Sequence, residues 1–255
     1  MFKLDAYKLK WLAIIGMIAN HIVFALWEIL PMWLAFPLYA AGGLTFPIMG
    51  YFVVEGYRHT RSVGKYVLRL LIFGAIAIPF HYLTFRAFGL NIMFTIMLSV
   101  AALILNDKMK IRPLFWLVFI LLLVASVVFM ADWMIIGPIV VLLYHKIKNE
   151  NVRRIVPAVV SGVFWLLLIL FSMVGLAQMQ ALGIEDQMGG PTLMTDMNFL
   201  KVSLTFIIGC LIAAFLIKGY NGERGRKMKW TFYAFYPIHL AVLGITSVAL
   251  GLFTI

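Results

Sequence analysis

The chain of 255 residues is 64% hydrophobic and only 12% charged, and its mean hydropathy is +1.02. This composition excludes an ordinary soluble domain and predicts an all-α, polytopic integral membrane protein with a helical bundle fold. The net charge of +11 comes mostly from basic residues in the expected cytoplasmic loops, where they set the topology, so no nucleic-acid partner is expected.

Apolar runs bounded by charge, proline or glycine recur along the whole chain. A helix needs about 20 apolar residues to cross a bilayer, so the runs predict about nine transmembrane helices. Because we find no internal repeat or linker, we expect a single transmembrane domain over residues 1–255. The expected spans are 8–29, 33–56, 66–86, 90–106, 113–130, 132–147, 154–178, 198–218 and 231–253.

The positive charges support this topology. Lys and Arg concentrate in the cytoplasmic loops of membrane proteins. With a cytoplasmic N-terminus, all of the 21 Lys and Arg residues except Arg86 and Lys201 fall in segments predicted to be cytoplasmic. The expected topology is therefore nine spans with the N-terminus inside and the C-terminus outside.

Two histidines lie deep inside predicted spans. His21 is roughly 20 Å from Lys8 along the first helix, and His239 is roughly 15 Å from Lys229 along the last. The two share nearly the same depth and could face one cavity. An ionisable side chain at this depth is a candidate functional residue, although a neutral imidazole can also serve only in helix packing. Asn20 precedes His21 and points about 100° away around the helix, so we expect it to reach a different neighbour or the substrate.

A cationic stripe enters the third span from the cytoplasmic side. Arg58, Arg61, Lys65 and Arg69 follow one another at intervals of three or four residues, which is the spacing of one helix face. Most of these charges suit any cytoplasmic loop, but Arg69 lies inside the apolar span. A cationic cluster at this position would suit a phosphorylated ligand from the cytosol. The neighbouring Glu55 could pair with one of the arginines.

Other chemistries lack support in the sequence. No P-loop, GxGxxG, HExxH or GxSxG motif is present. The five histidines and one cysteine show no metal-ligand spacing, so we expect no metal site.

Several segments together resemble the TraX family. They are LDAYKLKWLAIIGMIANHI, FPIMGYFVVEGYRHTRSVGKYVLRLLIFGAIAIPF, NIMFT, DWMIIGP and FYPIHL, in this order, and they cover most of the chain outside about 150–225. The family takes its name from a bacterial enzyme that acetylates the N-terminus of conjugative pilin, and it belongs to a wider transmembrane acyltransferase superfamily. The resemblance therefore implies a multi-pass protein of the bacterial cytoplasmic membrane.

The resemblance also implies roles for individual residues. A first-helix histidine is the candidate catalytic residue of the superfamily, which corresponds to His21, and basic residues entering the third helix are associated with acyl-CoA, which corresponds to Lys65 and Arg69. Many relatives have an acidic residue before the histidine, where this chain has Asn20. Many also have an arginine before the FP of the second span, where this chain has Gly43 and Leu44.

The resulting hypothesis is a membrane-bound acyltransferase that uses acetyl-CoA and modifies an amine or hydroxyl acceptor, which could be a peptide, a polymer or a small molecule. The partners are thus acyl-CoA, the lipid bilayer and this acceptor. The expected site residues are His21, Asn20 and His239 for catalysis, Arg58, Lys65 and Arg69 for the CoA moiety, and Glu55, Asn91 and Tyr236 for the substrate. The alternatives are a small-solute transporter with a histidine proton relay and a noncatalytic scaffold.

Overall fold

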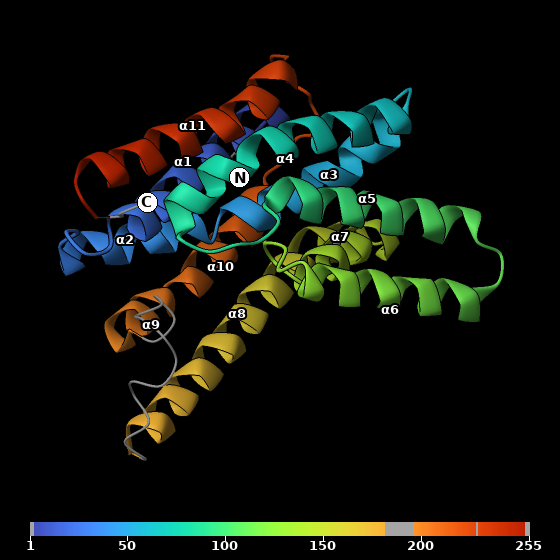
Figure 1. Cartoon of the computed structure of the whole chain (residues 1–255). Coiled ribbons are helices and arrows are strands. Elements are labelled where there is room, and N and C mark those ends of the chain that lie inside the picture. The colour runs from blue at the N-terminus through green and yellow to red at the C-terminus, as the bar shows by residue number, and fades with distance from the viewer. Residues whose placement is uncertain (1–2, 182–195, 228, 253–255) are drawn as a thin grey trace.

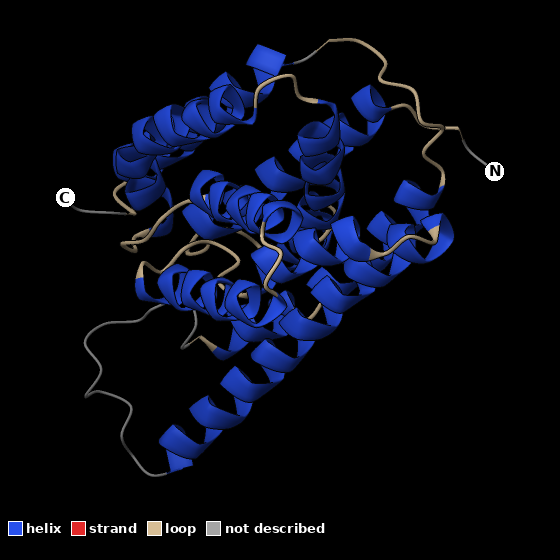
Figure 2. Ribbon diagram, turned by 90° about the vertical axis from the view of Figure 1, so that its right-hand side faces the viewer, coloured by secondary structure: helices blue, strands red, loops and turns tan. Residues whose placement is uncertain are grey.

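The computed structural model describes residues 3–181, 196–227 and 229–252. These residues form eleven α-helices, and outside the helices their only β-structure is an isolated bridge between Leu4 and Tyr220 (Figure 2). The helices are α1 (Ala6–Leu26), α2 (Met32–Gly42), α3 (Thr45–His59), α4 (Val63–Phe85), α5 (Ile92–Lys108), α6 (Arg112–Val128), α7 (Ile136–Lys146), α8 (Glu150–Ala181), α9 (Met197–Ser203), α10 (Phe206–Lys218) and α11 (Lys229–Ala249).

The described helices match the predicted spans once two breaks are taken into account. Helices α2 and α3 continue one another over Met32–His59, and α9 and α10 do so over Met197–Lys218. Six segments of the described chain are long and apolar enough to cross a membrane. Helices α5 and α6 have 17 residues each and α7 has 11, so these three are shorter than a usual span. The prediction of a helical membrane bundle is confirmed.

The apolar runs did not reveal the two breaks, and the α2–α3 break packs closely against α10. A methyl group on Gly43 would lie 2.9 Å from the Cα of Gly209, and one on Gly209 would lie 2.7 Å from the Cα of Gly43. Close to this contact, the Thr205 hydroxyl donates a hydrogen bond to the Phe36 carbonyl (3.2 Å). Small residues let helix backbones approach closely in membranes, so these glycines allow α10 to cross the α2–α3 break.

Helices α1, α4 and α11 lie side by side and run in the same direction (Figure 1). Near their N-terminal ends, the Lys10 ammonium lies 5.5 Å from the ring of Phe232. Near their C-terminal ends, the Arg86 guanidinium donates to the Ser247 hydroxyl (3.4 Å). All predicted site residues except Glu55, Arg58 and Asn91 lie on these three helices.

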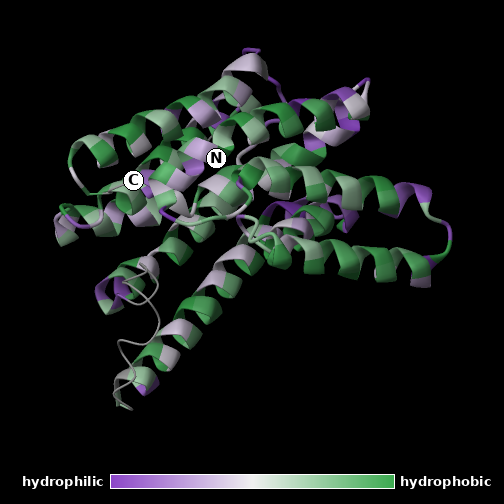
Figure 3. Cartoon of the chain, in the orientation of Figure 1, coloured by the Kyte–Doolittle hydropathy of each residue, from purple (hydrophilic) through white to green (hydrophobic). Residues whose placement is uncertain are grey.

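Apolar side chains cover the outside of the bundle. Figure 3 shows hydrophobic residues along most of the helices, while hydrophilic residues gather at helix ends and connections. Leu117 and Ile120 of α6 and Phe171 of α8 are among the large apolar side chains that are exposed. A soluble protein rarely exposes so much continuous apolar surface, so this surface faces lipid.

Polar contacts join the helix ends that are predicted to be cytoplasmic. Asp107 at the end of α5 accepts hydrogen bonds from the Tyr57 hydroxyl of α3 (2.9 Å) and from Nε2 of His145 in α7 (2.8 Å). Arg58 donates to the carbonyl of His145 (3.1 Å). The C-terminal ends of α3, α5 and α7 therefore lie together, as the alternating topology requires.

Cysteine labelling can test this topology in the membrane. After Cys210, which is buried, is replaced by Ala, a cysteine at Asn149 is expected to react only from the cytoplasmic side. A cysteine at the exposed Phe88 is expected to react only from the outside, because one connection lies at each end of the bundle. A membrane-impermeant maleimide on intact and opened cells would measure both, and reaction of both from one side would contradict the nine-span topology.

Candidate functional site

The structure brings the two deep histidines into direct contact. Nδ1 of His21 in α1 lies 2.8 Å from Nε2 of His239 in α11. Both residues are buried, with exposed fractions of 9% and 7%. The ring centroids are 5.0 Å apart and the ring planes differ by 13°. The sequence-based expectation that the two histidines could share one cavity is therefore realised as a hydrogen-bonded pair.

The hydrogen bonds define where the protons of this pair reside. Nδ1 of His239 lies 3.0 Å from the carbonyl oxygen of Phe235, and a carbonyl can only accept. His239 must therefore carry its proton on Nδ1, which leaves a lone pair on Nε2 of the neutral ring. His21 then donates from its own Nδ1. The one ring nitrogen of the two histidines that can still accept a proton is therefore Nε2 of His21.

Aromatic side chains surround the pair. The ring of Phe85 in α4 meets His21 edge-on at a centroid distance of 5.0 Å. Phe235 stacks on His239 at 4.9 Å, and Tyr236 meets the same ring at 5.4 Å. Tyr236, which was expected to contact substrate, is 1% exposed and lies beside His239. These contacts keep bulk water away from both imidazoles, which strengthens their hydrogen bond.

Asn20 lies on another side of α1 from the histidine pair. Its side chain packs against Gly42 of α2, where a Cβ would come within 2.8 Å of its Oδ1. That Oδ1 is buried and has no hydrogen-bond partner among the described residues. The structure thus places Asn20 against a different neighbour, and its buried acceptor still needs a donor.

Two of the three predicted CoA-binding residues lie on α4 near its N-terminus. Lys65 is exposed, and the Arg69 guanidinium lies over the ring of Tyr233 at 5.4 Å. Nε of Arg69 is buried and has no hydrogen-bond partner among the described residues. Arg58 instead bonds to α7 and lies 3.8 Å from Glu55. Of the four residues in the predicted stripe, only Lys65 and Arg69 lie on α4, since Arg58 is in α3 and Arg61 is in the connection between the two helices.

Lys10 lies near the N-terminal end of α1, against aromatic rings of α3 and α11. Its ammonium nitrogen is 4.9 Å from the ring of Phe52 and 5.5 Å from that of Phe232. Sequence reasoning counted Lys10 only as a charge that sets topology. Its position inside the first helix, directly before the apolar residues 11–19, was the signal that could have marked it.

The structure gives Glu55 and Asn91 contacts within the protein. Glu55 lies 3.4 Å from Nη2 of Arg153 and also pairs with Arg58. Asn91 is fully buried at the start of α5, where its Oδ1 accepts from the Met93 amide (3.1 Å) and its Nδ2 donates to the Gly74 carbonyl (2.8 Å). These contacts hold helix ends together, and they occupy the polar groups that were expected to contact substrate.

A histidine–aspartate pair, which sequence reasoning missed, lies close to the His21–His239 pair. His81 of α4 is buried, and its Nε2 lies 3.3 Å from Oδ1 of Asp132 in the α6–α7 connection. Phe85 contacts both histidine rings, at 4.6 Å from His81 and 5.0 Å from His21. His81 could have been selected by the same criterion as His21, since it also lies deep within an apolar span.

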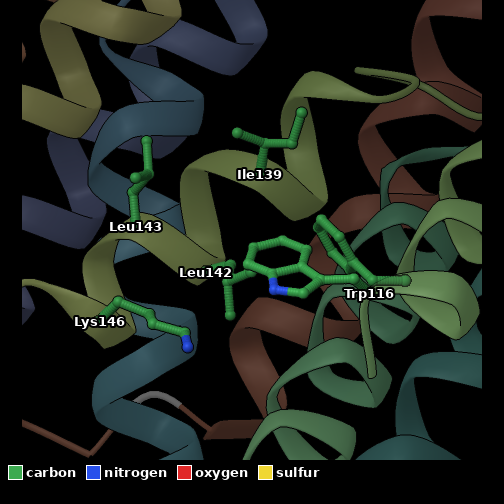
Figure 4. Close-up of a pocket in the computed structure, with 6 residues that line it drawn as sticks. Trp116, Ile139, Leu142, Leu143 and Lys146 are labelled. Atoms are coloured by element: carbon green, nitrogen blue, oxygen red, sulfur yellow. The ribbon is translucent and has the colours of Figure 1, made fainter. Parts of the chain in front are cut away.

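A pocket of about 370 Å³ lies elsewhere, between α6 and α7 (Figure 4). Apolar side chains line it except at one end, where Lys146 stands. The lining residues are Trp116, Phe119, Ile139, Leu142, Leu143 and Lys146. Since none of the predicted site residues lines this pocket, we place the candidate functional site at the histidine pair.

The comparisons with known proteins agree with the order of motifs along the chain. The family model described as TraX protein matches residues 6–247. The chain is similar to a protein of Dichelobacter nodosus named "Probable fimbrial assembly protein FimC, serogroup H1", with 29% identity over 259 residues that cover 94% of each chain. No solved structure shows a significant match. Because the family model spans nearly the whole chain, this membrane protein belongs to the TraX family.

Proposed function

We propose that the protein is an acyltransferase of the bacterial cytoplasmic membrane that transfers an acetyl group from acetyl-CoA to an amine or hydroxyl acceptor. The observation that carries this proposal is the buried His21–His239 pair, in which the free lone pair resides on Nε2 of His21. A neutral imidazole with a free nitrogen, held by a second group, is the arrangement of a general base. The relative named for fimbrial assembly suggests that the acceptor is a surface protein.

In the proposed reaction, Nε2 of His21 takes a proton from the acceptor as its nitrogen or oxygen attacks the thioester carbonyl. The proton then passes to the sulfur as the bond between carbonyl carbon and sulfur breaks, so the products are the acetylated acceptor and CoA. His239 Nε2 accepts a hydrogen bond from Nδ1 of His21 throughout. It therefore holds the His21 ring in one orientation and tautomer, which is one of the two roles of the carboxylate in a catalytic triad.

The position of the basic residues supports entry of the donor from the cytosol. Lys65 and Arg69 lie one turn apart on α4, and Arg69 is 12 residues before His81, or roughly 18 Å along the helix. Phosphate groups bound there would be near the cytoplasmic surface, with the flexible pantetheine arm directed along α4 and α11 toward His21. The buried Nε of Arg69 offers a donor for a phosphate oxygen.

The proposal can be tested directly by acetyl transfer. Membranes that contain the protein are supplied with acetyl-CoA labelled in the acetyl group, and label in protein, peptide and polymer fractions is measured. We expect label that depends on the protein and is lost with His21→Gln. Label that is equal with the variant or without the protein would contradict the proposed function.

Binding of the donor can be tested separately. Acetyl-CoA at about 100 times its Kd should stabilise the purified protein by about 2.7 kcal/mol, seen as a higher melting temperature. We expect Lys65→Ala with Arg69→Ala to lose most of this shift, because the phosphates lose their cationic partners. Lys110→Ala, an exposed lysine of the α5–α6 connection, serves as the matched control. An unchanged shift in the double variant would place the donor elsewhere.

A further inference from the structure

The connection between α6 and α7, which contains Asp132, has an unusual backbone conformation on both sides of this residue. Met130, Trp133 and Met134 have φ values of 49°, 62° and 29°, which are unfavourable for residues with a side chain. Among the described residues, the one other non-glycine residue with positive φ is Arg86, at the end of α4. Strained residues persist only where surrounding contacts hold them, and they gather at functional sites.

Neighbouring segments hold this connection in place. The Asp132 amide donates to the Leu90 carbonyl (2.8 Å), and the Leu90 amide donates to the Phe129 carbonyl (3.2 Å). The Thr95 hydroxyl donates to the backbone carbonyl of Asp132, and Trp133 stacks on Phe46 at 4.0 Å. The backbone of Asp132 is thus anchored, while its carboxylate is left to face His81.

The pair combines a buried base with a carboxylate that reaches solvent. The His81 side chain is 6% exposed and that of Asp132 is 32% exposed. With Asp132 ionised, Nε2 of His81 donates to it, so Nδ1 of the neutral ring is the proton acceptor. By the expected topology, this end of the bundle faces outward, opposite to Lys65 and Arg69.

We propose that His81 and Asp132 form the acceptor subsite, which selects a cationic amine and removes its first proton. This inference rests on the proposed function and names the residues that would bind and deprotonate its acceptor. An ammonium ion must lose two protons to become an amide. Nδ1 of His81 takes the first proton, which then passes to the solvent beside Asp132. Nε2 of His21 takes the second proton as the carbon–nitrogen bond forms and the carbon–sulfur bond breaks. The second proton ends on sulfur, so ammonium and thioester give amide, thiol and one proton.

Among the charged and titratable groups near His81, Asp132 is the one that can orient its ring and accept a cationic amine. Helix α1 contributes His21, and Glu28 in the connection after α1 pairs with Arg86 at the end of α4. Helix α11 contributes Tyr236 and His239, of which the latter is bonded to His21. The titratable residues of α5, Asp107 and Lys108, lie at its opposite end. Asp132 is therefore the carboxylate positioned to orient His81.

The test compares pH profiles of acetyl transfer by the purified protein. The substrates are acetyl-CoA and a short peptide with a free N-terminal amine, whose pKa is about 8. For Asp132→Asn and His81→Gln we expect losses of about 10²-fold below pH 7, mainly as a higher KM for the peptide. The losses should shrink above pH 8, because most of the amine is then already neutral in solution and has no first proton to lose. The loss in His21→Gln should persist at every pH.

The outcomes separate this inference from the function on which it rests. An active wild type with variants that are unaffected, or that lose the same factor at every pH, would contradict the acceptor subsite alone. A wild type that transfers no acetyl group to any fraction would contradict the proposed function. Melting temperatures and stabilisation by acetyl-CoA show that the variants are folded, and the two substitutions serve as independent tests of the same pair.

Discussion

Replacing His21 by glutamine is expected to lower acetyl transfer by about 10²–10⁴-fold, the usual contribution of a positioned general base. Glutamine retains hydrogen-bonding capacity and approximate size but has no titratable nitrogen. The variant should therefore fold and bind acetyl-CoA, because the predicted donor contacts lie near Lys65 and Arg69. The measurements are turnover, melting temperature and the shift caused by acetyl-CoA.

A matched control is His59→Gln, since the side chain of His59 is 77% exposed. This variant should keep full activity.

The partner histidine gives a finer test. A glutamine at His239 can still accept a hydrogen bond from Nδ1 of His21 through its carbonyl oxygen, whereas phenylalanine cannot. His239→Gln should thus retain more activity than His239→Phe. Near-normal turnover in His21→Gln would make His21 a packing residue.

The second large effect concerns stability. Gly209→Ala is expected to destabilise the fold by about 1–3 kcal/mol or more, the range for overpacking a close contact. The added methyl would meet the backbone of Gly43 at 2.7 Å, and a backbone cannot rotate away as a side chain can. Helix α10 would have to move from the α2–α3 break. Thermal unfolding in detergent measures the loss.

The matched control is Gly175→Ala in α8, where a Cβ would meet no heavy atom of the described residues within 4 Å. Alanine there should be neutral or stabilising by up to about 1 kcal/mol, because it favours the helix. Equal melting temperatures of Gly209→Ala and Gly175→Ala would contradict this prediction, because they would show that α10 can shift away from Gly43 with no loss of stability.

Much of the architecture followed from hydropathy and charge. A bilayer requires long helices whose backbone groups are bonded internally, so apolar runs in the sequence locate the helices. The expected spans 66–86 and 198–218 correspond closely to α4 and to α9 with α10. The break at Gly43 could not be predicted, because it lies where α10 packs closely through Gly209, and these two distant segments meet only in the folded chain.

By itself, the sequence determined that this is a helical membrane protein of the TraX type with buried histidines near one depth, since depth follows from residue spacing along a helix. Only the tertiary structure decided which residues share a site. It joined His21 to His239, turned Arg58 toward α7, and brought Asp132 to His81. The physical reason is that the rotation and pairing of membrane helices depend on side-chain packing between them, which no single apolar run contains.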